Sequence, residues 1–128
     1  MKPSRRIMLV GLGALALLSA VHWARAHHFD GPPLLLYLLG VLPNFAAAIA
    51  IPFVTLGIWL ESSPVSSQAV LRQRFLWLSL FAGVGLFLWE FGQRWSRGLF
   101  FDPDDLVATS VGLVVGWTIF RLISREDR

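Results

Sequence analysis

Glu90 and Gln93 form the polar pair that is best placed to bind a ligand or to transfer a proton. They lie three residues apart near the end of an apolar run, and side chains at this spacing project from one face of a helix. An ionisable group at membrane depth is costly and usually points inward toward a partner, which makes Glu90 a functional candidate. A structural role stays open, because Arg94 lies four residues further on and is within reach of an intrahelical ion pair.

A second polar group follows eight residues after Arg94. Asp102 precedes a proline, a combination typical of a helix N-terminus, so Asp102 is expected to be an N-cap rather than a catalyst. Asp105 is the stronger candidate, because it begins a stripe of helix positions at steps of 4, 3 and 4 residues. The stripe continues through Thr109, Gly112 and Gly116. The two glycines form a small-xxx-small pattern, which lets another helix approach closely.

These two groups predict one polar pocket. If the neighbour of the glycine stripe is the preceding apolar run, the acidic residues of both groups converge at the outer membrane surface, with Arg94 or Arg97 as the counter-charge. Asn44 is either a further pocket residue or the N-cap of its own helix. The candidate pocket residues are Glu90, Gln93, Arg94, Asp102, Asp105, Thr109 and Asn44.

The stretch from Glu90 to Gly116 resembles the VanZ-like membrane proteins. In that family a Glu and a Gln one helical turn apart close one span, and an acidic cluster with downstream glycines opens the next. Residues 43–45 fit the pattern more loosely, and Ala108-Thr109 stands where many members carry Asn. The resemblance implies a small cell-envelope protein, in a family named for an accessory glycopeptide-resistance protein.

Composition points to a lipid environment. Of the 128 residues 55% are hydrophobic and only 15% are charged, which is not typical of a water-soluble domain. The net charge of +3 comes from basic residues that flank apolar runs, so it indicates membrane topology rather than nucleic-acid binding. The absence of cysteine excludes disulfides, thiolate nucleophiles and cysteine-ligated metals.

The apolar runs predict an all-α, polytopic membrane protein with a single domain over residues 1–128. A span needs roughly 17 to 25 apolar residues, and four such runs use most of the chain. The expected spans are residues 7–24, 44–60, 75–91 and 103–123. Residues 34–42, too short to cross, are expected to form an interfacial or re-entrant helix before the second span. The first run has an alternative as a cleaved signal peptide, because residues 24–26 resemble a cleavage site.

Basic residues and tryptophans predict the orientation. With both ends in the cytoplasm, eight Lys and Arg lie inside and three outside, as the positive-inside rule requires. The inner residues are Lys2, Arg5, Arg6, Arg72, Arg74, Arg121, Arg125 and Arg128; the outer ones are Arg25, Arg94 and Arg97. Tryptophan agrees, since Trp23, Trp89 and Trp95 fall at the outer interface and Trp59, Trp77 and Trp117 toward the inner one.

Three functions fit these observations. The first is a non-enzymatic envelope protein that binds a lipid-linked or glycan ligand, or a partner protein, through the outward pocket. The second is an enzyme acting on a lipid head group or glycan, with Glu90 or Asp105 as general base or as ligands of a divalent cation. The third is a proton or cation pathway through Glu90. No metal site is expected from the histidines, because the spacing of His22, His27 and His28 offers little support for one.

Overall fold

Four helices make up most of the chain. The computed structural model describes residues 1–63, 67–95, 98 and 101–125, so Arg97 and Arg128 of the charge count lie outside the described residues. The helices are α1 (Pro3–Ala26), α2 (Pro33–Ser62), α3 (Gln68–Gln93) and α4 (Pro103–Arg125). Each is long and apolar enough to cross a membrane. The predicted all-α fold with four candidate spans is therefore confirmed.

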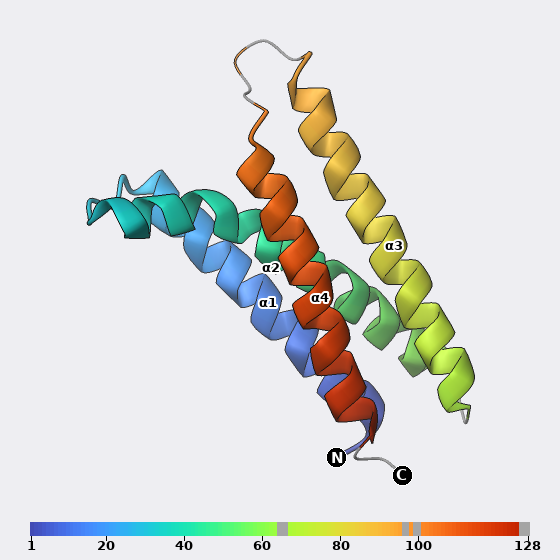
Figure 1. Cartoon of the computed structure of the whole chain (residues 1–128). Helices are drawn as coiled ribbons and strands as arrows, with labels where there is room; N and C mark the ends of the chain where they lie inside the picture. The colour runs from blue at the N-terminus through green and yellow to red at the C-terminus, as the bar shows by residue number, and fades with distance from the viewer. Residues whose placement is uncertain (64–66, 96–97, 99–100, 126–128) are drawn as a thin grey trace.

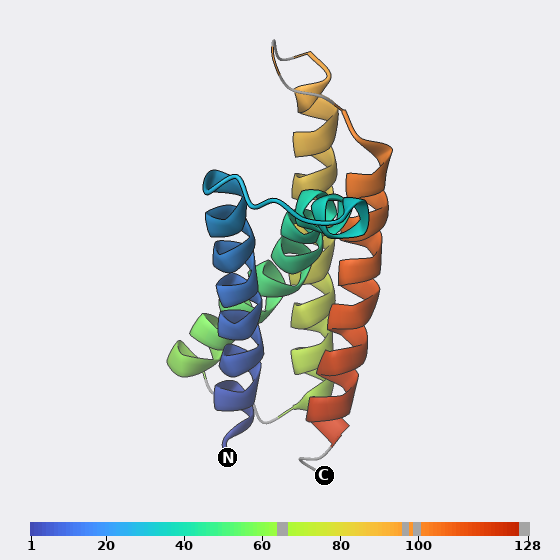
Figure 2. The ribbon, with the colours of Figure 1, turned by 90° about the vertical axis from the view of Figure 1, so that its left-hand side faces the viewer.

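The helices run between two opposite ends of the molecule. The beginning of α1 and the end of α4 lie at one end, which we call the terminal end, and the C-terminal end of α3 and the N-terminal end of α4 lie at the other (Figures 1 and 2). A beginning and an end on the same side are what an even number of crossings requires. The predicted pocket residues of α3 and α4 therefore lie opposite the terminal end.

Helix α2 is continuous through two prolines. It includes Pro43 and Pro52, so the segment expected as a separate helix is the beginning of α2. Figure 1 shows that this beginning lies across the other helices, as an interfacial segment would, before α2 turns toward the opposite end. Proline has no N–H to donate to the carbonyl four residues earlier, and its ring crowds that turn, which bends a helix without ending it when neighbours support it. Asn44 thus lies inside a helix, and its predicted role as an N-cap is wrong.

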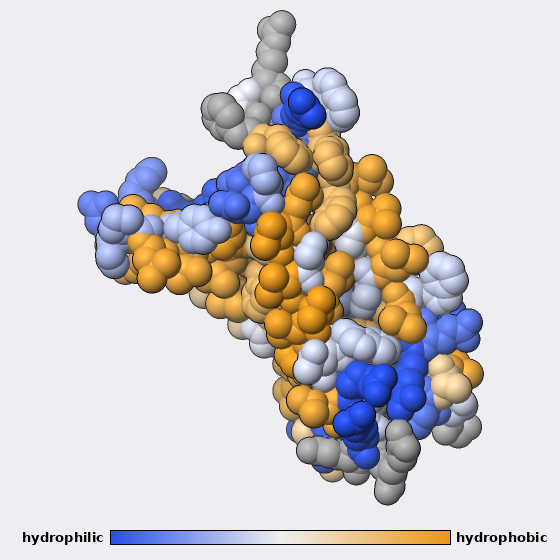
Figure 3. Space-filling model, in the orientation of Figure 1, coloured by the Kyte–Doolittle hydropathy of each residue, from blue (hydrophilic) through white to orange (hydrophobic). Residues whose placement is uncertain are grey.

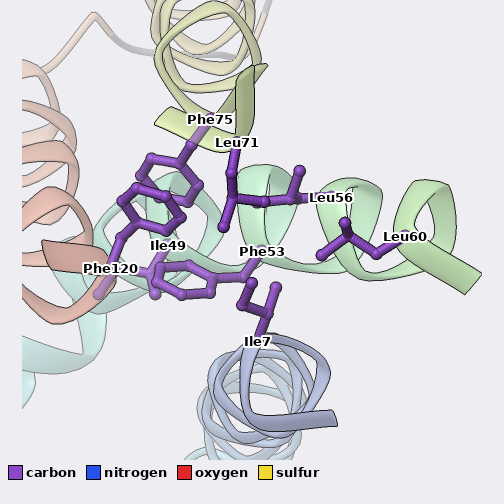
Figure 4. Packing of buried hydrophobic residues seen from close by; sticks show 8 residues of the cluster. All are labelled: Ile7, Ile49, Phe53, Leu56, Leu60, Leu71, Phe75 and Phe120. Atoms are coloured by element: carbon purple, nitrogen blue, oxygen red, sulfur yellow. The ribbon is translucent and has the colours of Figure 1, made fainter. Parts of the chain in front are cut away.

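A core of apolar side chains closes the half of the bundle nearest the terminal end. Its fully buried members come from all four helices (Figure 4). Phe75 stacks on Phe120 with ring centroids 4.2 Å apart, and Phe53 meets Phe75 edge-on at 4.9 Å. Such aromatic pairs add about 0.5–1.5 kcal/mol each beyond the area they bury. The core residues are Ile7, Ile49, Phe53, Leu56, Leu60, Leu71, Phe75 and Phe120.

The outer surface is as apolar as a bilayer requires. Large side chains such as Phe81 and Leu88 are 69% and 65% exposed, and Figure 3 shows hydrophobic residues over the middle of the molecule with hydrophilic ones gathered toward its ends. A soluble monomer rarely exposes a continuous apolar patch of this kind. The exposed apolar surface is consistent with a lipid environment.

The glycine stripe of α4 packs against α2. A Cβ placed on Gly112 would lie 2.6 Å from the carbonyl oxygen of Phe45 and 2.9 Å from the Cβ of Ala48. Close packing at this stripe was predicted, but the neighbour is α2 rather than the preceding helix. Helix α3 meets α4 at a different position, where Gly83 faces the side chain of Leu113.

Candidate functional site

The carboxylate of Glu90 is almost fully buried. Its side chain is 1% exposed. The Oε1 atom accepts a hydrogen bond from Gln93 Nε2 at 2.8 Å and a longer one from Asn44 Nδ2 at 3.4 Å. The first contact confirms that Glu90 and Gln93 share a helix face. The second oxygen, Oε2, has no hydrogen bond of normal geometry to the described residues, although the backbone N–H of Asp102 also interacts with this carboxylate. One acceptor of the buried group is therefore incompletely satisfied.

Asn44 reaches this site from α2. It follows Pro43, where the bent helix passes close to the end of α3, and it contacts a residue 46 positions away in sequence. Its amide also interacts with the carboxylate of Asp105. Asn44 therefore links the two acidic groups, and it occupies the position that the sequence offered as the alternative to a helix cap.

Asp105 brings a second carboxylate to the same place. It lies in the first turn of α4, and its Oδ1 atom is buried with no hydrogen-bond partner in the described part of the chain. Glu90 and Asp105 are close enough to interact electrostatically. The acidic groups at the ends of α3 and α4 thus meet, and each retains one incompletely satisfied oxygen.

Two other predicted pocket residues serve the backbone of α4 instead. Asp102 caps the helix, because its Oδ1 accepts the N–H of Asp104 at 2.9 Å, and its side chain is exposed. The hydroxyl of Thr109 is buried and donates to the Asp105 carbonyl at 2.9 Å. Asp102 is confirmed as an N-cap, and neither side chain lines the pocket.

The positive charge at the site comes from α1. Arg94 is exposed at the C-terminal end of α3 and does not line the pocket, and Arg97 lies outside the described residues. Arg25 lines the pocket and interacts electrostatically with Asp105. The ion pair between Glu90 and Arg94, which the sequence left open as a structural alternative, is not formed in the described structure.

His22 joins Arg25 at the pocket. The two residues and Leu18 are spaced by 4 and 3 positions, so they form one stripe of α1. The spacing alone therefore predicts that the two side chains lie on one face of α1, but it does not show which helix this face contacts. The His22 ring bonds the Leu18 carbonyl through Nδ1 at 2.9 Å, which leaves Nε2 available to a ligand.

All four helices contribute to the cavity that these side chains enclose, which we call the acid pocket. Its volume is about 430 Å³. The polar lining residues are His22, Arg25, Asn44, Glu90, Gln93 and Asp105. The apolar ones are Leu18, Gly40, Pro43, Ala47, Leu86 and Trp89. A cavity of this size with a few convergent polar groups is typical of a small-molecule site.

The described residues contain no group of three side chains suited to hold a metal ion. His27 bonds the Trp23 carbonyl at 2.8 Å and is not a lining residue of the acid pocket. The side-chain oxygens of the acid pocket that could bind a cation are those of Glu90, Asp105, Asn44 and Gln93, whereas Ca²⁺ takes six to eight oxygen ligands.

Comparison of the chain with protein-family models, with curated proteins and with solved structures finds no match.

Proposed function

We propose that this chain is a VanZ-like integral membrane protein of the cell envelope that binds a lipid-linked or glycan ligand through the acid pocket. The pocket lies opposite the terminal end, and it faces away from the cytosol if the charge balance of the connections sets the orientation.

The incompletely satisfied oxygen of Glu90 carries this proposal. A buried acceptor without a well-formed hydrogen bond costs about 1–3 kcal/mol, and more when it is charged. Gln93 and Asn44 both bond the other oxygen, so they hold the carboxylate in place and leave Oε2 for something else. A ligand that donates a hydrogen bond to Oε2 would recover this cost.

The remaining groups indicate what such a ligand offers. The incompletely satisfied oxygens of Glu90 and Asp105 accept hydrogen bonds, and sugar hydroxyls donate them. Arg25 donates hydrogen bonds from α1, and a guanidinium binds phosphate oxygens well. His22 donates its Nδ1–H to the Leu18 carbonyl, so its Nε2 is a further acceptor. A head group with hydroxyls and a phosphate satisfies both sets of groups.

The family resemblance supports the same function. Of the residues that carry it, Glu90, Gln93 and Asp105 line the acid pocket, and Asn44 lines it from the more loosely fitting second segment. These four residues belong to the pocket, whereas Asp102, Thr109, Gly112 and Gly116 serve the cap and the packing of α4.

Substitution of Glu90 by Gln tests the proposal. The amide keeps the shape of the side chain and removes the charge that strengthens its hydrogen bonds. A charge-assisted bond contributes about 1.5–3 kcal/mol, so Glu90→Gln should weaken binding about 10-fold or more. The measurement is an equilibrium titration of the protein in nanodiscs with a prenyl diphosphate that carries one N-acetylhexosamine.

Glu61→Gln is the matched control, because Glu61 is exposed at the far end of α2. It should leave the affinity unchanged. Equal binding by the wild type and Glu90→Gln, or no binding by the wild type, would contradict the proposal. A product that forms only with added Mg²⁺ or Mn²⁺ and is lost in Glu90→Gln would favour the enzyme instead.

A further inference from the structure

A second cavity of about 420 Å³ lies between α2 and α3. Its walls include Ile51 from α2 and Leu78, Phe81 and Gly85 from α3. The one polar side chain in its lining, Thr55, donates its hydroxyl to the Ile51 carbonyl at 2.6 Å. The Thr55 hydroxyl is therefore satisfied within its own helix. We call this cavity the apolar groove.

The apolar groove continues the acid pocket. Leu86 lines both cavities. On α3 the lining positions of the two cavities follow one stripe, 93, 90, 86, 82 and 78, at steps of 3 and 4 residues. On α2 the corresponding stripe is 40, 44, 47, 51 and 55. The same faces of the same two helices thus carry the polar section and the apolar section.

The dimensions suit one hydrocarbon chain. The groove runs along α3 from Leu86 to Leu78, and eight residues of helix correspond to about 12 Å. Half of a hydrocarbon core of roughly 30 Å is about 15 Å, so the groove has the depth of one leaflet. Gly85 provides room beside it, since a Cβ at this position would meet nothing within 4 Å.

We propose that the ligand is a lipid, with its polar head group in the acid pocket and its hydrocarbon chain in the apolar groove. This inference rests on the proposed function and narrows it from a lipid-linked or glycan ligand to the lipid-linked one. Phe81 and Ile51, 69% and 41% exposed, leave the groove open to the bilayer, so a chain can enter it sideways while the head group enters the pocket.

Two probes that carry the same head group distinguish binding of the head group in the acid pocket from binding of the chain in the apolar groove. The first is the N-acetylhexosamine prenyl diphosphate, and the second is the water-soluble diphosphate sugar without the chain. A chain that fits the groove makes closer van der Waals contacts than mobile detergent tails do, so the wild type should bind the first probe at least about 10-fold more tightly. Both titrations use the full chain in detergent micelles, with the empty micelle as the blank.

Gly85→Leu fills the groove without touching the pocket. It should bring the affinity for the chain-bearing probe down to that for the water-soluble probe, whose own binding should not change. Gly13→Leu in α1 is the matched control, because a Cβ at Gly13 also meets nothing within 4 Å and Gly13 lines neither cavity. It should retain the preference for the chain.

Each other outcome overturns a defined claim. Equal binding of both probes by the wild type would contradict the proposal that a hydrocarbon chain lies in the apolar groove. It would remain compatible with a head-group site in the acid pocket. A chain preference that survives Gly85→Leu would place the chain elsewhere and also overturn the inference. If Gly85→Leu changes the oligomeric state measured by light scattering, the groove is a contact with a second copy. Failure of both probes to bind would reject the proposed function and the inference together.

Discussion

Two carboxylates with different neighbours share the acid pocket. Glu90 is held on one oxygen by two amides, whereas Asp105 faces Asn44 and the positive charge of Arg25. Their proximity is unfavourable when both are ionised, because like charges repel strongly where water is scarce. A donor-rich ligand that lies between them relieves this repulsion.

Asp105→Asn should weaken binding of the prenyl diphosphate sugar about 5- to 10-fold, because an amide is a weaker acceptor than a carboxylate. Asp104→Asn is its neighbour control, since Asp104 is exposed and does not line the pocket. Titration of both variants in nanodiscs gives the comparison. The pocket assignment would be wrong if Asp104→Asn weakened binding as much as Asp105→Asn does.

The sequence predicts contacts within a helix better than contacts between helices. The hydrogen bond from Gln93 to Glu90 follows from the spacing of the two residues. The place of Arg25 does not, because it depends on how α1 and α4 are arranged in space, and Arg25 and Asp105 are 80 positions apart in sequence. The basic residues that lie near Glu90 in sequence are Arg94 and Arg97, so the sequence offered these two as the counter-charge.

Helix pairing shows the same distinction. The glycine stripe of α4 was visible in the sequence, yet a small-xxx-small pattern says only that some helix comes close. The bend in α2 near Pro43 brings Phe45 and Ala48 against the stripe. Because a bend of this kind depends on neighbours that support the freed backbone groups, the prolines alone did not reveal whether α2 would break or continue.

Gly112→Ala should destabilise the bundle. An added Cβ would lie 2.6 Å from the Phe45 carbonyl oxygen, and backbone there can yield little. Overpacking of this type typically costs about 1–3 kcal/mol. Gly116→Ala is the matched control, since its Cβ would have neighbours at 3.7 Å, an ordinary contact distance.

The free energy of unfolding of both variants can be measured in mixed micelles by titration with a denaturing detergent, with helicity as the readout. Only Gly112→Ala should shift to lower denaturant. A larger loss in Gly116→Ala would mean that α4 is rotated about its axis relative to the packing described here.

The bundle as a whole has one closed and one open end. The aromatic and aliphatic core joins all four helices near the terminal end, and the acid pocket separates them near the other end. Arg74 and Arg121 lie over the rings of Trp59 and Trp117 in the closed half. Cationic and aromatic groups gather here as they do at a cytoplasmic membrane interface.

The orientation of this bundle can be tested with single cysteines, because the chain contains none of its own. Asp30→Cys lies between α1 and α2, near the pocket end, and Ser63→Cys follows α2 at the closed end. Both positions are exposed. If both termini are cytoplasmic, a membrane-impermeant maleimide should label Asp30→Cys in right-side-out vesicles and Ser63→Cys only after the vesicles are opened.

The reverse labelling pattern would place the acid pocket on the cytosolic side. The pocket residues, the apolar groove and their titrations would keep their meaning, since none of them depends on the direction of insertion. The ligand would then have to be a lipid whose head group is presented in the cytosolic leaflet. Labelling of both positions in sealed vesicles would instead mean that residues 30 and 63 lie on the same side of the membrane. Helix α2 would then not be a span.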